Sequence, residues 1–108
     1  VGSEYRGVLR RLDAAIGELV ATVRSRPSYA DENWLVVIST DHGHLDEGGH
    51  GGGSWQERQS FIVAASLSQE PLRWREHAQP VDLAPTILAH LEVPIASSWG
   101  YEGRSLLW

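Results

Sequence analysis

The stretch "STDHGHLDEGGHGGGS", residues 39–54, concentrates the groups of this chain that are most able to do chemistry. It holds three of the five histidines, two aspartates and a cluster of glycines, and it follows an apolar run. Imidazole nitrogens and carboxylate oxygens are good ligands for Zn²⁺ and also suit Mn²⁺. The stretch therefore predicts a metal site, with a phosphate cradle and a solvated polar turn as the alternatives.

Asp41, His42 and His50 are the strongest candidate ligands. Asp41 and His42 follow the apolar run at its carboxyl end, where open α/β sheets bind their ligands. Adjacent side chains on an extended strand point to opposite faces, so the backbone must turn before both can reach one cation. Gly43 is expected to permit the unusual dihedral angles of that turn. Three such ligands can complete a catalytic zinc site with an open position, or supply half of a two-metal site.

The other polar groups of the stretch carry weaker predictions. His44, Asp46 and Glu47 alternate with other residues as the side chains of an exposed loop do, so a solvated loop is the favoured interpretation for them. A Ser or Thr nucleophile needs an adjacent activator, and no such group is assigned to any hydroxyl of the chain. Arg58 can pair with a substrate phosphate or lie on the surface, and the surface interpretation is favoured.

Helical and strand patterns surround this stretch. Helices are expected over Ser3–Arg24 and Val81–Leu91, with Ser3 and Asp82 as their N-caps, and Gly17 is expected to mark a close packing contact. Strands are expected over Trp34–Thr40 and Phe61–Ala65. Because both runs are continuously apolar, we expect these strands to be covered on both faces. The order of elements predicts α/β layering.

Composition limits the classes of function. The chain has 108 residues, which corresponds to about one domain. Its formal net charge of −5 argues against a nucleic-acid surface, and the absence of cysteine excludes a thiolate metal site. No apolar run is long enough to cross a membrane. Because methionine is absent and the chain begins almost directly in a helical pattern, we expect a piece of a longer protein.

Four segments carry a resemblance to a known family. "VVISTDHGHLDEGGHGG", "ERQSFIVAA", "VDLAPTILAHLEVP" and "YEGRSLL" together resemble the C-terminal part of the alkaline phosphatase superfamily. The nearest match is its type I phosphodiesterase/nucleotide pyrophosphatase and sulfatase-like group, and the resemblance covers nearly the whole chain. It implies that residues 1–108 are the C-terminal portion of a single hydrolase domain. The implied fold is a partial three-layer α/β/α sandwich of the alkaline-phosphatase-like type that lacks its N-terminal part.

The resemblance also implies a reaction and a set of ligands. In that superfamily two metal ions activate a Ser or Thr nucleophile and hold the phosphoryl oxygens. Asp41 and His42 would bind the metal nearer the nucleophile, and His50 would bind the other. Zinc is expected and manganese is the alternative. Sulfatases proper usually bind a single Ca²⁺, so His50 favours a phosphodiesterase or phosphatase-like site. The expected substrate is a small-molecule phosphate ester, with His44 and Arg58 as weak candidates for binding it.

The chain lacks part of the pattern that the resemblance implies. The nucleophile and the remaining metal-binding residues belong to upstream segments that nothing in this chain matches, so we expect the 108 residues alone to be inactive. The parent is expected to be a metal-dependent hydrolase of phosphate esters. The alternatives are a non-catalytic α/β module or degenerate remnant, and, among enzymes, a sulfatase or phosphotransferase of the same superfamily.

Overall fold

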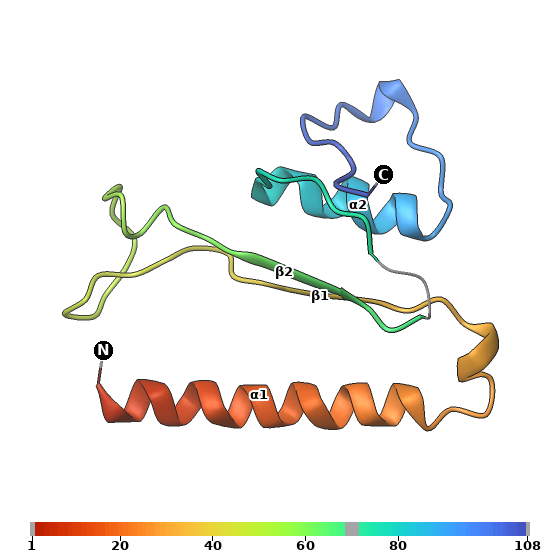
Figure 1. The fold of residues 1–108 in the computed structure, drawn as a ribbon. Helices are drawn as coiled ribbons and strands as arrows, with labels where there is room; N and C mark the ends of the chain where they lie inside the picture. The colour runs from red at the N-terminus through yellow and green to blue at the C-terminus, as the bar shows by residue number, and fades with distance from the viewer. Residues whose placement is uncertain (1, 69–71, 108) are drawn as a thin grey trace.

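A computed structural model describes residues 2–68 and 72–107 (Figure 1). Within these residues there are two α-helices, α1 (Ser3–Arg24) and α2 (Leu83–His90). Between them along the chain lie two strands, β1 (Leu35–Ser39) and β2 (Ile62–Ser66). Each bound lies within two residues of the range expected from the sequence. Three short 3₁₀ turns complete the elements of the described ranges: Tyr29–Asp31, Pro80–Asp82 and Ser97–Trp99.

The strands form an antiparallel pair. Leu35 lies opposite Ser66 at one end of the pair, and Ser39 lies opposite Ile62 at the other. In Figure 1, α1 lies on one side of the pair and α2 lies on the other. The fold is therefore a small mixed α/β arrangement, which confirms the α/β class. The connection between the strands, residues 40–61, emerges at the end of the pair where the N-terminus of α1 also lies (Figure 1); we call it the glycine-rich loop.

The expectation that both strands are covered on both faces is wrong. No residue of either strand is buried, and Val63 of β2 is 52% exposed. The helices lie over the strands but do not pack tightly against them. A hollow of about 320 Å³ separates α1 from β1, and another of about 600 Å³ lies between the start of β1 and α2. A continuous apolar run specifies what a strand can bury, whereas its actual cover depends on the elements packed against it.

The tightest packing of the described residues is at α2. Pro85 and Thr86 of α2 and Leu106 of the C-terminal segment are fully buried. The Leu106 N–H donates to the Thr86 hydroxyl at 3.0 Å, and the Leu106 carbonyl accepts from the Arg75 N–H at 2.8 Å. A bridge between Trp74 and Leu107 extends this contact. The C-terminal segment is thus fixed to α2 and to the chain that precedes it.

Details of the helix ends differ from expectation. The N-cap of α1 is Gly2, and Ser3, expected as the cap, is the first helical residue. Asp82 occupies the N-cap position of α2 as expected, but its carboxylate accepts no hydrogen bond from the N–H groups of α2. It accepts instead from the N–H groups of Gln79 at 2.8 Å and Arg104 at 2.9 Å. Gly17 marks no close contact, because nothing lies within 4 Å of the Cβ that an alanine would carry there.

Candidate metal centre

Asp41 and His42 lie where the chain leaves β1. The Thr40 hydroxyl donates to the His42 carbonyl at 2.9 Å, and the His42 N–H donates to Asp41 Oδ1 at 3.0 Å. These local bonds turn the backbone so that the two neighbouring side chains face the same region. Asp41 Oδ2 lies 3.7 Å from His42 Nε2. The structure therefore brings these two predicted ligands together.

A backbone contact fixes the tautomer of His42. Its Nδ1 lies 2.7 Å from the Gly43 carbonyl oxygen. Because a carbonyl can only accept, Nδ1 carries the proton of the neutral ring and Nε2 keeps its lone pair. Metal-binding histidines commonly have this arrangement, in which the second ring nitrogen donates to a carbonyl or carboxylate.

His50 reaches the same region from the far side of the glycine-rich loop. It lies between Gly49 and Gly51, whose φ angles of +94° and +103° are readily available only to glycine. Its ring stacks on that of His42, with 4.6 Å between the centroids and 29° between the planes. The loop thus places the third predicted ligand against the second.

Gly43 has a different role from the one expected. Its φ angle is not positive, whereas Gly48, Gly49 and Gly51 all have positive values. A Cβ at Gly43 would lie 2.1 Å from the Gln56 carbonyl oxygen, a separation that no side chain tolerates. Glycine is therefore required at this position because another backbone segment approaches it closely.

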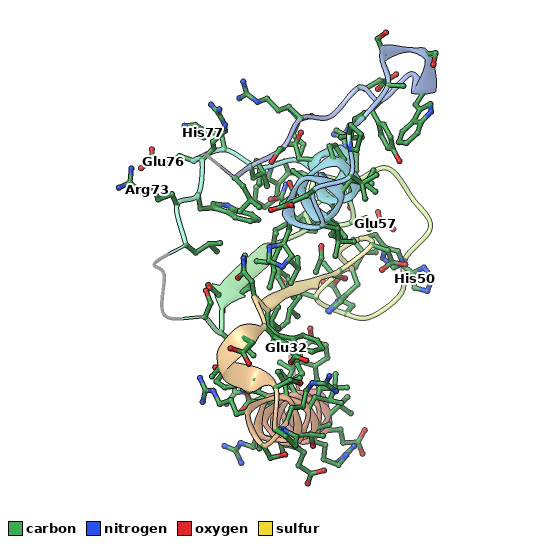
Figure 2. All side chains as sticks on the ribbon, turned by 90° about the vertical axis from the view of Figure 1, so that its right-hand side faces the viewer. Glu32, His50, Glu57, Arg73, Glu76 and His77 are labelled. Carbon is green, nitrogen blue, oxygen red and sulfur yellow. The ribbon has the colours of Figure 1, made fainter. Side chains whose placement is uncertain are left out.

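Glu57 was not predicted from the sequence as part of this region. Its side chain is only 8% exposed, and its carboxylate accepts from the Gly52 N–H, the Ser54 N–H and the Ser54 hydroxyl at 2.7, 3.1 and 2.6 Å. The Ser54 hydroxyl and these N–H groups, with a further contribution from nearby His50, hold the pKa of Glu57 below its ordinary value of 4.5. Figure 2 labels His50 and Glu57 on the same side of the molecule. The S-x-x-E spacing of a capping box was the available signal.

The donor set fits a divalent cation in part. Zn²⁺ binds imidazole nitrogen and carboxylate oxygen at roughly 2.0–2.2 Å, so one ion can contact two atoms that lie 3.7 Å apart. Asp41 Oδ2 and His42 Nε2 meet this condition. In the described ranges, however, no three His, Asp or Glu side chains are gathered closely enough to hold one ion. The two imidazoles stack rather than converge on a shared point.

The two weak candidates for substrate binding differ in their surroundings. His44 packs edge-to-face on Tyr5 of α1, with 5.3 Å between the ring centroids, and its Nδ1 lies 2.8 Å from the Leu45 carbonyl oxygen. With His42 and Phe61 it lines a hollow of about 300 Å³. Arg58 is exposed, and its backbone N–H donates to the Ser54 carbonyl at 3.2 Å. His44 therefore faces a cavity beside the candidate metal centre, whereas Arg58 lies on the surface.

Comparison with known proteins assigns the family. The model of the sulfatase family matches residues 2–93. The chain belongs to the sulfatase family. The family lies within the alkaline phosphatase superfamily, so the resemblance is confirmed at that level. No solved structure matches the chain. Over the described residues of this sulfatase-family chain, no helix has the length and apolar character needed to cross a bilayer.

A curated relative is consistent with this assignment. The human protein named GPI ethanolamine phosphate transferase 2, catalytic subunit, is 25% identical to the chain over 91 residues. The match covers 81% of this chain but 9% of the human protein. The sulfatase-family chain therefore corresponds to a small part of that relative, whose name describes an ethanolamine phosphate transferase.

Proposed function

We propose that this chain supplies Asp41, His42 and His50 to a two-metal centre that acts on phosphate esters. The observation that supports the proposal best is the approach of His42 Nε2 to Asp41 Oδ2 at 3.7 Å, with Nδ1 occupied by the Gly43 carbonyl. These two atoms are close enough for one divalent cation to bind both, with the Nε2 lone pair of His42 and an oxygen of Asp41 as its ligands. The stacked ring of His50 brings a third donor to the same place.

The proposal divides the three ligands between two ions. Asp41 and His42 would hold the ion nearer the nucleophile and His50 would hold the other, so no single ion would need all three side chains. Zinc is the first choice, because two imidazoles and one carboxylate suit it, and manganese is the alternative. When bound, a pair of such ions supplies Lewis-acid stabilisation of the entering and departing oxygens of an in-line displacement.

Three side chains cannot complete two coordination spheres. We therefore propose that residues 1–108 are the C-terminal portion of an alkaline-phosphatase-like domain and contribute to its three-layer α/β/α sandwich. The nucleophile and the remaining ligands would come from sequence outside this chain. The 108 residues alone would then turn over no substrate. Added Zn²⁺ or Mn²⁺ and a nitrophenyl phosphodiester test this directly, because appreciable turnover by the isolated chain would refute it.

Hydrolysis and group transfer are the two candidate reactions. Hydrolysis of a small phosphate ester, in the manner of a phosphodiesterase or nucleotide pyrophosphatase, is the first candidate, because His50 favours such a site over that of a sulfatase. Transfer to an alcohol is favoured by the similarity to an ethanolamine phosphate transferase. In both cases His44 is the stronger of the two substrate-binding candidates, because it lines a hollow beside His42 while Arg58 is exposed.

The activity test uses the intact protein, that is, the longer parent protein that contains these 108 residues. Metal analysis of the purified protein should find two divalent ions per molecule, and a nitrophenyl phosphodiester should be cleaved. Products formed with and without an added alcohol distinguish transfer from hydrolysis.

His42→Ala and His50→Ala should each lower the turnover by more than about 100-fold, since even indirect perturbation of metal ligands costs 10–100-fold. His77→Asn is the matched control, because His77 lies outside the site and its φ of +63° suits asparagine. A protein that binds no metal and keeps its turnover in both alanine variants would contradict the proposal and favour a non-catalytic module.

A further inference from the structure

Glu57 contacts the segment that carries His42. Its main-chain carbonyl accepts a hydrogen bond from the Gly43 N–H at 2.9 Å. Gly43 is the residue that follows His42, and its own carbonyl fixes the His42 ring at Nδ1. The short turn that contains Glu57 also presses on Gly43 closely enough to exclude a Cβ there. A displacement of this turn would therefore move His42.

The side chain of Glu57 holds the segment that carries His50. Its two carboxylate oxygens accept from Gly52 and Ser54, which follow His50 by two and four residues. The Ser54 hydroxyl in turn accepts from the Glu57 N–H at 3.2 Å. A Cβ at Gly52 would lie 2.7 Å from the carboxylate, so the approach is close. This buried carboxylate connects the end of the flexible segment to the turn.

The segment around His50 needs such an anchor. Glycines at positions 48, 49, 51, 52 and 53 give the backbone great conformational freedom, and ordering it costs entropy. A turn in which Leu45 exchanges backbone hydrogen bonds with Gly48 and Gly49 fixes the segment before His50. The carboxylate of Glu57 fixes it after His50. His50 is thus held from both sides, and the anchor on the second side, Glu57, also accepts the N–H of Gly43 beside His42.

We infer that Glu57 is the positioning residue that sets His50 against His42, through its main-chain carbonyl on one segment and its carboxylate on the other. The effect of Glu57 on metal binding rests on the proposed function, whereas its effect on the position of His50 does not. The negative charge beside His50 would also attract a cation bound there. Outer groups that orient metal ligands in this way typically contribute 10–100-fold to metal affinity.

The first experiment needs no metal. In the metal-free intact protein, Glu57→Gln places an amide N–H₂ against N–H donors and should loosen the segment. Hydrogen exchange measured by mass spectrometry should then be several-fold faster in peptides covering residues 41–54 and unchanged in α1. Glu47→Gln is the matched control, because Glu47 is exposed on the same loop. Equal exchange in the wild type and both variants would overturn the inference.

The second experiment measures Zn²⁺ binding by calorimetry. Glu57→Gln should weaken the affinity by about 10-fold or more, while Glu47→Gln should stay close to the wild type. Equal affinities in all three proteins would overturn the role of Glu57 in metal binding. A wild-type protein that binds no Zn²⁺ would overturn the proposed function instead, and the hydrogen-exchange comparison would still decide whether Glu57 holds the segment.

A second variant covers the case in which Glu57→Gln fails to fold. Ser54→Ala removes one of the three hydrogen bonds to the carboxylate and leaves its charge in place. It should change exchange and Zn²⁺ affinity in the same directions by a smaller factor. Exchange and affinity both equal to those of the wild type would contradict the inference.

Discussion

The Thr86 hydroxyl joins α2 to the C-terminal segment by accepting the N–H of Leu106 at 3.0 Å, and both residues are fully buried. The same hydroxyl donates to the Asp82 carbonyl at 2.6 Å. Thr86→Val keeps the shape of the side chain but leaves the Leu106 N–H without its acceptor. We expect it to lower the free energy of unfolding by about 1–3 kcal/mol, the usual cost of an unsatisfied buried donor. Urea denaturation measures this loss.

Thr22→Val is the matched control for this prediction. Thr22 also donates from its hydroxyl to a carbonyl four residues earlier in a helix, at 2.8 Å, but it is exposed. Water can replace that bond, so the change in the free energy of unfolding should stay within about 0.5 kcal/mol. Equal losses in the two variants would show that the bond to Leu106 contributes nothing of its own.

Asp82 should make the stability depend on pH. The N–H groups of Arg104 and Gln79 hold the pKa of Asp82 below its ordinary value of 3.8. Since its pKa is lower in the folded state than in the unfolded state, the ionised group stabilises the fold at pH values above 3.8. This contribution is lost as the pH falls through the folded-state value. The difference in unfolding free energy between the wild type and Asp82→Asn should therefore be largest near neutral pH and shrink in acid.

The control for this prediction is Asp13→Asn, a change at an exposed position of α1. At neutral pH, Asp82→Asn should lower the free energy of unfolding by about 1–3 kcal/mol, because one of the two N–H donors then faces an amide N–H₂. Asp13→Asn should cost much less. A wild-type to Asp82→Asn difference that stays constant from neutral to strongly acidic pH would contradict the prediction.

Gly43→Ala tests the close approach of the backbone at Gln56 to the backbone at Gly43 within the glycine-rich loop. The added Cβ would lie 2.1 Å from the Gln56 carbonyl oxygen, so the turn that contains Gln56 and Glu57 must move away. We expect destabilisation by several kcal/mol, as strain of this kind exceeds the usual range for single substitutions. Thermal denaturation of the purified variant measures it. Gly53→Ala is the control on the same loop, since nothing lies within 4 Å of its Cβ and its φ is not positive. Equal stability of the two variants would contradict the contact.

Local patterns predicted the elements well because those patterns act over short distances. The 3.6-residue spacing of Ser3–Arg24 and the apolar runs around β1 and β2 located each element to within two residues. The incomplete cover of the strands could not be predicted in this way. It depends on where α1 and α2 settle over the sheet, which no local pattern encodes.

The candidate site shows the same division. The sequence placed Asp41 and His42 together at the end of a strand, and the structure brings His50 against His42. Their role as metal ligands stays a prediction. The role of Gly43 was misjudged, since it depends on a backbone segment 13 residues away that only the folded loop brings near. Glu57 could have been predicted from the S-x-x-E spacing of a capping box with Ser54. The sequence prediction rested on the nearby histidines instead.

The ion pair of Arg26 and Glu32 gives a last prediction, on the segment that leads from α1 into β1. Arg26 donates from Nε and Nη2 to the Glu32 carboxylate at 2.8 and 2.7 Å, and the Ser28 hydroxyl and Trp34 indole N–H donate to it as well. Arg26 is the largest of the influences that lower the pKa of Glu32 from 4.5 to about 2. The group therefore stabilises the fold above pH 4.5, and this contribution is lost as the pH falls from 4.5 to about 2.

Glu32→Gln should lower the denaturation midpoint at neutral pH, and the gap to the wild type should close near pH 2. Added salt should narrow the gap at neutral pH, because the pair is exposed enough to be screened. Glu18→Gln, at an exposed position of α1, is the control and should leave the midpoint nearly unchanged. A gap that widens as the pH falls would mean that the folded state favours the protonated carboxyl, which would contradict the network seen around Glu32.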